Sequence, residues 1–337
     1  MNCDIIIPVW NQLALTKDCL SSIFANTGPG YGIIVVDNAS AADTKNYLEA
    51  TKSLSKAPFN IIRNEINLGF IKAVNQGIAA SKARYVCLLN NDTIVTKGWL
   101  EAMIEVAESS PEIGIVNPSS NNLGQKPAQG EPIELYAEKL RNSTIKTAEI
   151  ATAIGFCMLI KRAVIEKIGF FDEIYGMGNF EDTDFSRSAA KAGYRAVRAV
   201  RAYVYHRENS SFKRRKDYEI SFNRNREIYE SRWGKPKRIA CVLDLHDSGA
   251  LKRSGLDSIK LALEGNWVFY FFTGQPDLPE HPNITKVMLS GRRFRLNALF
   301  GILKKKKKFN EILVGDKKLG KLLEHLKFIH KAEIKYY

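Results

Sequence analysis

The stretch Arg84-Tyr85-Val86-Cys87-Leu88-Leu89-Asn90-Asn91-Asp92-Thr93 decides the fold. It begins as a short apolar run of strand type and ends abruptly in three polar residues, of which the last, Asp92, is a carboxylate. Ligands of open α/β sheets bind outside the carboxyl ends of the strands. A carboxylate at that edge can hold a hard cation such as Mg²⁺ or Mn²⁺, which in turn holds a diphosphate. The alternative is an asparagine-rich turn that only ends a strand.

Strands and helices alternate in the sequence before this stretch. Each predicted strand is a short apolar run, and each predicted helix carries apolar residues at helical spacing. The alternation predicts an α/β fold with a mostly parallel sheet and helices on both of its faces. The predicted strands are 4–9, 31–36, 60–64 and 84–89, and the predicted helices are 13–26, 44–54 and 71–81.

Polar residues stand where three of these strands end, at one predicted edge of the sheet. They are Asp37, Asn64 and Asp92. Helix capping accounts for any one of them, but three in the same position favour a nucleotide site. The chain has no G-x-G-x-x-G after its first strand and no G-K-[ST], which disfavours an ordinary dinucleotide fold or a P-loop.

The sequence after Asp92 continues the α/β pattern with one irregular interruption. Strands are predicted at 113–118 and 155–160, and a helix at 162–168. Between the two strands, residues 119–148 are polar and irregular. We expect this segment to be a mobile loop over the site.

Three carboxylates stand close together in Glu181-Asp182-Thr183-Asp184, directly before a predicted amphipathic helix at 185–192. A helix N-terminus stabilises negative charge. Capping needs only one carboxylate, and like charges so close repel unless a cation, a hydroxyl substrate or a base role uses them. The group therefore favours a functional site over a simple cap.

A histidine, His206, ends the predicted strand 202–207. A lone histidine is commonly a structural residue with satisfied hydrogen bonds. Here it lies at a strand end beside Arg207, a position that favours a metal or phosphate role.

Composition describes a globular protein of one large or two ordinary domains. The chain has 337 residues, 45% of them hydrophobic and 26% charged. No apolar run approaches the ~18 residues of a membrane span, and no signal peptide is evident. The five cysteines are scattered, so we expect reduced core residues of a cytoplasmic protein.

The formal net charge of +14 has three candidate causes: nucleic acid, an anionic membrane surface or an anionic substrate. The excess gathers in 195–207, 213–216, 232–238 and the lysine run 304–308. For that lysine run we expect a solvated helix C-terminus, with membrane attraction as the alternative.

Eight short motifs occur in the order that is typical of one enzyme family. Together they cover roughly residues 1–230, and the combination is specific although each piece is weak. The chain resembles a family 2 glycosyltransferase of GT-A fold, close to the rhamnosyltransferase-like branch. The motifs are Ile7–Asn11, Val35–Ser40, Asn67–Phe70, Leu89–Thr93, Gly169–Glu173, Phe180–Phe185, Ala192–Arg195 and Val204–His206.

The resemblance implies a role for each matching residue. Asp182 matches the catalytic base, and Glu181 its neighbour near the acceptor. Asp92 and His206 match the metal ligands, with Asn90 in place of the first aspartate of a D-x-D motif, which is common in this branch. The expected cofactor is Mn²⁺ or Mg²⁺. The residues expected to hold the nucleoside-diphosphate sugar are Pro8, Trp10, Asp37, Asn64, Asn91 and Arg207.

The implied activity is an inverting, metal-dependent transfer of a sugar to a hydroxyl of a glycan, lipid-linked or protein acceptor. The implied setting is bacterial surface polysaccharide or glycoconjugate synthesis, in the cytoplasm and at the inner face of the membrane. No specific nucleic-acid partner is expected. Two alternatives stay open. One is a nucleotidyltransferase-like enzyme, whose glycine- and lysine-rich phosphate loop is not visible. The other is a non-catalytic polyanion-binding module.

A second, smaller α/β domain is predicted after Lys235-Pro236-Lys237, where the character of the sequence changes. We therefore divide the chain into residues 1–235 and an accessory domain, 236–337. The accessory domain weakly resembles the first half of a Rossmann-like glycosyltransferase of GT-B type. Its predicted strands are 238–245, 267–272, 283–289, 309–314 and 332–336, and its predicted helices are 253–264, 294–303 and 317–326.

Overall fold

The computed structural model describes residues 2–207, 218–243, 258–274, 278 and 281–336. The basic segment 213–216 and the first part of the predicted helix 253–264 lie outside the described residues. Contacts divide the chain into two compact units, Met1–Arg232 and Trp233–Tyr337.

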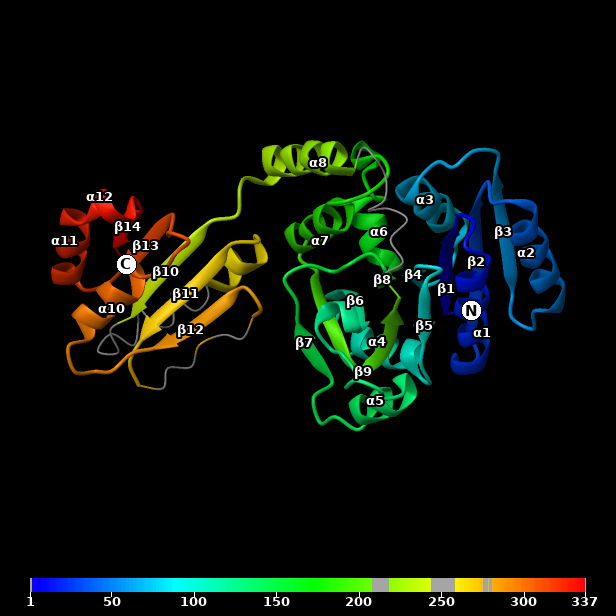
Figure 1. The fold of residues 1–337 in the computed structure, drawn as a ribbon, viewed down its shortest axis with the longest axis horizontal. Coiled ribbons are helices and arrows are strands. Elements are labelled where there is room, and N and C mark those ends of the chain that lie inside the picture. Colours follow the sequence, from blue (N-terminus) through cyan, green and yellow to red (C-terminus); the bar gives the residue numbers. More distant parts are fainter. Residues whose placement is uncertain (1, 208–217, 244–257, 275–277, 279–280, 337) are drawn as a thin grey trace. The chain divides into compact units, whose positions relative to one another are not determined.

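The N-terminal unit is built on a nine-stranded sheet with the order β3-β2-β1-β4-β8-β6-β9-β5, and β7 pairs with β9 (Figure 1). The run β3-β2-β1-β4 is parallel, whereas β8 is antiparallel to both of its neighbours. The strands are β1 (Cys3–Val9), β2 (Tyr31–Asn38), β3 (Phe59–Asn64), β4 (Tyr85–Leu89), β5 (Thr93–Val95), β6 (Ile113–Ser119), β7 (Thr147–Glu149), β8 (Cys157–Lys161) and β9 (Arg195–His206).

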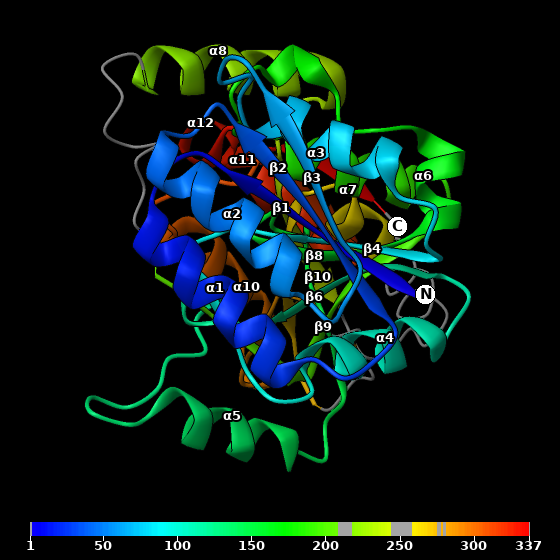
Figure 2. The same ribbon diagram turned by 90° about the vertical axis from the view of Figure 1, so that its right-hand side faces the viewer.

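Helices cover both faces of this sheet because its central strands are apolar on both sides. In β1, Ile5 and Ile7 pack into the core beneath α1 and α4, and Ile6 points to the opposite face, towards α3. A Cβ on Gly77 of α3 would lie 2.4 Å from Ile6, so only glycine lets that helix approach so closely. Figure 2 shows α1 and α2 in front of the strands. The helices are α1 (Leu13–Asn26), α2 (Ala42–Leu54), α3 (Phe70–Ala80), α4 (Trp99–Glu108), α6 (Arg162–Ile168) and α7 (Glu181–Lys191).

The segment 119–148 corrects one prediction. Instead of a mobile loop, it holds the short helix η1 (Asn121–Leu123), the helix α5 (Ile133–Arg141) and the start of β7. Tyr136 of α5 packs edge-on against Tyr203 of β9, with ring centroids 5.1 Å apart. Tertiary contacts thus order a segment whose own sequence is polar.

Two helices near the site also differ from the predictions. The helix α7 begins at Glu181, four residues before the predicted start, so its three carboxylates lie in the first turn. The helix α8 (Tyr218–Trp233) was not predicted. Its Tyr218, Phe222 and Tyr229 recur at helical spacing, a signal that the polar residues between them obscure.

The C-terminal unit is a five-stranded, fully parallel sheet with the order β12-β11-β10-β13-β14. The predicted fold class is confirmed: a mostly parallel α/β domain is followed by a second, smaller α/β domain. The elements of this unit are β10 (Arg238–Leu243), a helical stretch at 258–263, β11 (Trp267–Phe272), β12 (Ile284–Met288), α10 (Phe294–Leu303), β13 (Glu311–Val314), α11 (Lys317–His325), α12 (Lys327–His330) and β14 (Glu333–Tyr336). The N-terminal unit also contains the short helix η2 (Glu173–Tyr175).

Within the described part of the chain, none of the helices combines the length and the apolar character that crossing a membrane requires. All five cysteines are buried, and none of them forms a disulfide bond.

Candidate active site

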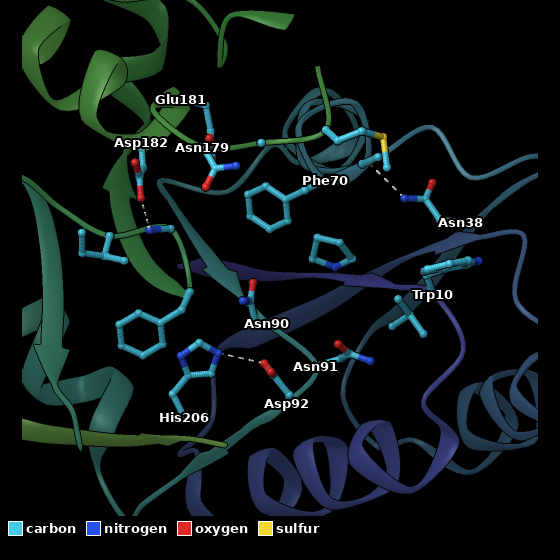
Figure 3. Close-up of a pocket in the computed structure, with 18 of the residues that line it drawn as sticks. Trp10, Asn38, Phe70, Asn90, Asn91, Asp92, Asn179, Glu181, Asp182 and His206 are labelled. Carbon is cyan, nitrogen blue, oxygen red and sulfur yellow. Dashed lines mark hydrogen bonds and ion pairs between the residues drawn. The ribbon is translucent and has the colours of Figure 1, made fainter. Parts of the chain in front are cut away.

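A cavity of about 630 Å³ opens at the carboxyl ends of β1, β2 and β4 (Figure 3). The chain leaves the sheet at this edge, so its turns and polar side chains form the wall. Most of the residues proposed from the sequence lie in the lining, and three do not. Lining residues are Pro8, Trp10, Asn91, Asp92, Glu181, Asp182 and His206, whereas Asp37, Asn64 and Arg207 lie outside the lining.

Asp92 and His206 form one side of the cavity. Antiparallel pairing of β5 with β9 sets Thr93 opposite His206, which brings the preceding carboxylate beside the ring. The Nε2 atom of His206 lies 3.0 Å from Oδ1 of Asp92. Phe156 stacks on the imidazole with ring centroids 5.0 Å apart and planes 14° apart. The ring is therefore held in one plane, with one nitrogen towards the carboxylate.

Two asparagines in the segment 119–148, Asn121 and Asn122, form hydrogen bonds with His206. Asn121 donates to the His206 carbonyl and accepts from its N–H, both at 2.8 Å. The side-chain nitrogen of Asn122 lies 2.9 Å from Nδ1 of the ring. Sequence reasoning missed both residues, because nothing in the pattern relates them to a histidine 84 residues later.

The Asp92–His206 pair fits a divalent cation as two ligands of a larger set. A carboxylate oxygen and an imidazole nitrogen 3.0 Å apart are a hard oxygen donor and a nitrogen donor that suit Mn²⁺. Among the described residues, no third side chain of His, Cys, Asp or Glu type joins Asp92 and His206 at this point. The remaining positions would therefore fall to diphosphate oxygens and water, which is usual for cations bound together with a nucleotide.

Glu181 and Asp182 form another part of the wall, at the N-terminus of α7. Asp182 accepts from the N–H of Gly155 at 3.1 Å and of Thr183 at 2.7 Å. Burial raises the pKa of Asp182, although these donors oppose the shift. Burial and the neighbouring Asp182 raise the pKa of Glu181 to about 8. Its Oε2 atom is buried and has no hydrogen-bond partner among the described residues.

Unusual backbone conformations gather in the turns beside the cavity. Asn11 and Gln12 have φ values of 56° and 57°, and Asn179 and Phe180 have φ values of 75° and 73°. Such conformations in non-glycine residues cost on the order of 1–3 kcal/mol each and persist where the surroundings enforce them. Asn11 and Gln12 directly precede α1, and Asn179 and Phe180 directly precede Glu181.

Asp37 and Asn64 lie behind the wall. Asp37 is 1% exposed, forms an ion pair with Arg63 and accepts from the N–H of Ser40. Asn64 donates to Asn38 at 2.7 Å, and the Asn38 side chain, which lines the cavity, donates to the carbonyl of Gly69. Asn38 therefore lies between Asn64 and the cavity, a role that its place in the motif Val35–Ser40 did not indicate.

Trp10, Asn91 and Arg207 differ in how they are held. Trp10 lines the cavity and is 49% exposed. Asn91 donates to the Thr16 hydroxyl at 2.9 Å. The Arg207 guanidinium pairs with Asp18 at 2.8 Å, while its backbone N–H donates to the carbonyl of Asp92.

Asp184, the third carboxylate of α7, has a different environment. It accepts from the Tyr175 hydroxyl at 2.9 Å and from Arg232 of α8 at 3.0 Å. It is buried, and it does not line the cavity. Asp184 thus links α7 to α8, whereas the other two carboxylates of the first turn, Glu181 and Asp182, line the cavity.

Comparison with known proteins relates part of this chain to one enzyme family. Residues 4–169 match the model of the family described as Glycosyl transferase family 2. The matched segment contains β1 to β8 and with them Asp92, but not the carboxylates of α7. The match covers just under half of the chain and supports the predicted family 2 glycosyltransferase type.

Curated relatives agree with this assignment. The chain is 26% identical over 172 residues to the poly-beta-1,6-N-acetyl-D-glucosamine synthase of Staphylococcus epidermidis, covering 50% of this chain and 41% of the relative. It is 28% identical over 149 residues to an uncharacterized glycosyltransferase of Haemophilus influenzae, covering 43% and 42%. The chain thus spans about two fifths of the length of these relatives. These matches support the predicted family 2 glycosyltransferase type, and the rhamnosyltransferase-like branch stays a prediction.

Solved structures share the GT-A fold of the N-terminal unit. The mannosyltransferase PcManGT from Pyrobaculum calidifontis, in complex with GDP-Man and Mn²⁺, has a TM-score of 0.51 at 17% identity, over 63% of this chain and 58% of that one. GalNAc-T7 with UDP, GalNAc and Mn²⁺ has a TM-score of 0.55 at 15% identity, over 78% and 54%. At these identities the likeness shows the fold.

Proposed function

We propose that the chain transfers a sugar from a nucleoside-diphosphate sugar to an acceptor hydroxyl, with inversion at the anomeric carbon and with a divalent cation as cofactor. The observation that carries this proposal is the Glu181–Asp182 pair and the Asp92–His206 pair in the wall of one cavity (Figure 3). Inverting transfer needs a base for the acceptor hydroxyl and positive charge for the departing diphosphate. The two pairs are suited to these two tasks.

Asp182 is the proposed general base. It would take the proton of the acceptor hydroxyl while that oxygen bonds to the anomeric carbon and the bond from this carbon to the diphosphate breaks. The N–H groups of Gly155 and Thr183 orient the carboxylate. Its raised pKa makes Asp182 a stronger base than an exposed aspartate. No covalent intermediate with the chain is required.

Glu181 is proposed to position the acceptor. With a pKa of about 8 it keeps its proton at neutral pH. It can therefore donate a hydrogen bond to an acceptor oxygen and does not compete with Asp182 for the transferred proton. Its second oxygen, now without a partner in the described structure, is the natural contact.

The donor is proposed to lie between Trp10 and the Asp92–His206 pair. Trp10 and Pro8 would pack against the nucleoside, and Asp37 would accept from the base once its ion pair with Arg63 loosens. A divalent cation held by Asp92 and His206 would neutralise the charge of the departing diphosphate. Further donor contacts are proposed for Asn91 and Arg207, and Asn64 is proposed to act through Asn38, which lies between it and the cavity.

The acceptor is proposed to be a glycan or a lipid-linked saccharide. One support is the relation to poly-beta-1,6-N-acetyl-D-glucosamine synthase, which makes N-acetylglucosamine a candidate sugar beside rhamnose. Another is charge: residues 233–337 contain 21 Lys or Arg and 10 Asp or Glu, so they carry +11 of the chain's +14. Such a unit is attracted to an anionic membrane surface, where lipid-linked acceptors lie.

Release of the nucleoside diphosphate tests the proposal. The full chain would be incubated with UDP-, GDP- and dTDP-linked sugars, with Mn²⁺ or with EDTA. We expect release of the free diphosphate with Mn²⁺, loss of release with excess EDTA, and recovery when Mn²⁺ is restored. Full activity after rigorous chelation would contradict the cation. Release of the sugar 1-phosphate instead, by cleavage between the two phosphates of the donor, would indicate a nucleotidyltransferase.

A further inference from the structure

Three helices of the C-terminal unit, α10, α11 and α12, pack on the same face of its sheet (Figure 1). Ile302 of α10 and Leu323 of α11 share a core with Ala240, Val242 and Phe271 of the strands. The helix α12 contacts both α10 and α11. The sides of these helices that point away from the sheet therefore form one outer surface, which we call the α10–α12 face and which comprises the exposed side chains of residues 292–331.

Large apolar side chains are exposed on the α10–α12 face. Phe300 is 55% exposed and Phe328 is 75% exposed. Leu296 precedes Phe300 by one turn of α10, so the two lie on one side of that helix. The buried residues Ala298 and Ile302 lie on the other side. Single exposed apolar residues are ordinary, but a group on one surface indicates an interaction site. The group consists of Leu296, Phe300, Leu322, Phe328 and Ile329.

Positive charge surrounds these apolar side chains. Residues 292–331 contain 13 Lys or Arg and 3 Asp or Glu, so they carry +10 of the +11 of residues 233–337. Two of the three carboxylates, Glu311 and Asp316, are already held in ion pairs with basic side chains. The Nζ atom of Lys304 lies 5.9 Å from the centre of the Phe300 ring. Ammonium groups and apolar side chains thus alternate on the same surface.

We propose that the α10–α12 face docks on an anionic lipid bilayer. Phe300 and Phe328 enter the boundary between headgroups and acyl chains, and the lysines beside them contact the lipid phosphates. Apolar side chains next to a lysine-rich polar surface are the features by which helices bind in the plane of a membrane. The proposed function gives the whole unit a general attraction to such a surface. The structure adds the face that makes the contact and the side chains that enter the lipid.

Charge disfavours two other occupants of this face. Residues 1–232 contain 29 Lys or Arg and 26 Asp or Glu, so the N-terminal unit offers no opposite net charge. A second copy of the same face would place +10 against +10. Like charges brought together in this way repel.

Nucleic acid has the right charge but does not match the apolar side chains. Binding to single strands uses aromatic rings on which bases stack. Three of the five exposed apolar side chains are aliphatic: Leu296, Leu322 and Ile329. A bilayer accommodates aliphatic and aromatic side chains equally, so the composition of the face favours lipid.

Binding of the full chain to sucrose-loaded vesicles tests the proposal. One set of vesicles consists of phosphatidylcholine alone, and the other of equal parts of phosphatidylcholine and phosphatidylglycerol. We expect binding to the anionic vesicles and much weaker binding to the neutral ones, measured by co-sedimentation. Added salt should weaken the binding without abolishing it, because salt screens the lysines and does not affect the apolar contact.

Two sets of substitutions separate the apolar from the charged contribution. Phe300→Ser combined with Phe328→Ser leaves the charge unchanged and should weaken vesicle binding by at least about 10-fold, since two rings no longer leave water. Lys306→Gln combined with Lys307→Gln should weaken it by roughly 10–30-fold at low salt, the usual contribution of two lysines near an anionic surface. All four side chains are exposed, so the variants should fold, and thermal unfolding would check this.

Matched controls lie in the N-terminal unit. Leu54→Ser combined with Ile66→Ser removes two apolar side chains that are 83% and 66% exposed. Lys52→Gln combined with Lys56→Gln removes the same charge as the lysine variant, at exposed positions in and after α2. Both controls should bind vesicles as the wild type does. Equal losses in the controls and in the variants of the α10–α12 face would show that overall charge or apolarity, and not this face, governs binding.

Insertion itself is measured with a fluorescent reporter. With wild type as the background, Phe300→Trp should show a blue shift of the added tryptophan on anionic vesicles, and quenching by lipids brominated in the acyl chain. Leu54→Trp should show neither change. An unquenched Phe300→Trp would overturn the insertion, even if the vesicles bound the chain.

The remaining outcomes distinguish this inference from the proposed sugar transfer. If the wild type does not bind anionic vesicles, the docking face is wrong, while release of the nucleoside diphosphate tests the transfer independently. If single-stranded RNA displaces the chain from vesicles and its binding has the same dependence on Phe300 and Phe328, the face serves nucleic acid instead. Vesicle binding by a chain that releases no diphosphate from any donor would support the docking face and contradict the transfer.

Discussion

Asp92 and Asp316 occupy the same kind of position in the two units, within three residues of the end of a buried strand, yet their environments differ. Asp316 follows β13 and caps α11, accepting from the N–H groups of Lys318 and Leu319 at 2.8 and 2.9 Å. It also pairs with Arg295. Asp92 follows β4 and faces the cavity beside His206. A carboxylate at a strand end therefore indicates a site only when capping does not use its oxygens.

Backbone strain differs between the units in the same way. In the described part of the C-terminal unit, the non-glycine residues with positive φ are Arg293, at the start of α10, and Lys331, at the end of α12. Helix ends are ordinary places for such conformations. In the N-terminal unit, strained pairs stand in the turns beside the cavity, one of them directly before Glu181. Strain next to unsatisfied polar atoms is the stronger sign of function.

The largest expected effect concerns the proposed base. Asp182→Asn keeps the shape of the side chain and removes its basicity, so we expect kcat to fall by roughly 10²–10⁴-fold. Donor binding should change little, because the proposed donor contacts lie elsewhere in the cavity. Single-turnover transfer and equilibrium binding of the nucleoside diphosphate would measure the two effects separately.

Asp184→Asn is the matched control for that substitution, two residues along the same helix. Asp184 accepts from Tyr175 and Arg232, so its replacement should lower the melting temperature before it lowers kcat. If the folded Asp184→Asn variant lost transfer while Asp182→Asn kept it, the base would be assigned to the wrong carboxylate.

Most of the fold could be predicted from the sequence, because buried parallel strands are continuous apolar runs that end at polar turns. The helices α1 and α6 have the predicted bounds, Leu13–Asn26 and Arg162–Ile168. The segment 119–148 could not be predicted, since contacts with β9 order it and its own composition does not. Local patterns carry no information about partners so distant in the chain.

The sequence also predicted which side chains would meet in one cavity, while their roles stay predictions. Strand ends and the start of α7 indicated Asp92, Glu181, Asp182 and His206, all of which line one cavity. What the sequence could not show is which carboxylate already has a partner. The ion pair of Asp37 joins residues 26 apart, and that of Asp184 joins residues 48 apart. These partners depend on the fold.

A smaller effect is expected in the pH dependence of stability. The pKa of Glu181 is raised from 4.5 to about 8 in the folded chain. Between these values the unfolded state loses the proton while the folded state keeps it, so stability falls as pH rises through this window. Glu181→Gln has no proton to lose, so its melting temperature should fall less between pH 5 and pH 8. Glu138→Gln, at an exposed glutamate of α5, is the control and should keep the wild-type slope. Equal slopes for wild type and Glu181→Gln would show that Glu181 ionises normally.

The smallest expected effect is on donor binding when the C-terminal unit is removed. The cavity and the residues proposed to hold the donor belong to Met1–Arg232. Residues 1–235 should therefore bind UDP or GDP with Mn²⁺ as the full chain does, as measured by calorimetry. In the full chain, Asp316→Ala should cost about 1 kcal/mol of stability, the usual effect of losing a helix cap, and leave binding unchanged. If the truncated protein folds and fails to bind, or if Asp316→Ala weakens binding, the C-terminal unit contributes to the donor site. The contrast between the two strand-end aspartates would then be wrong.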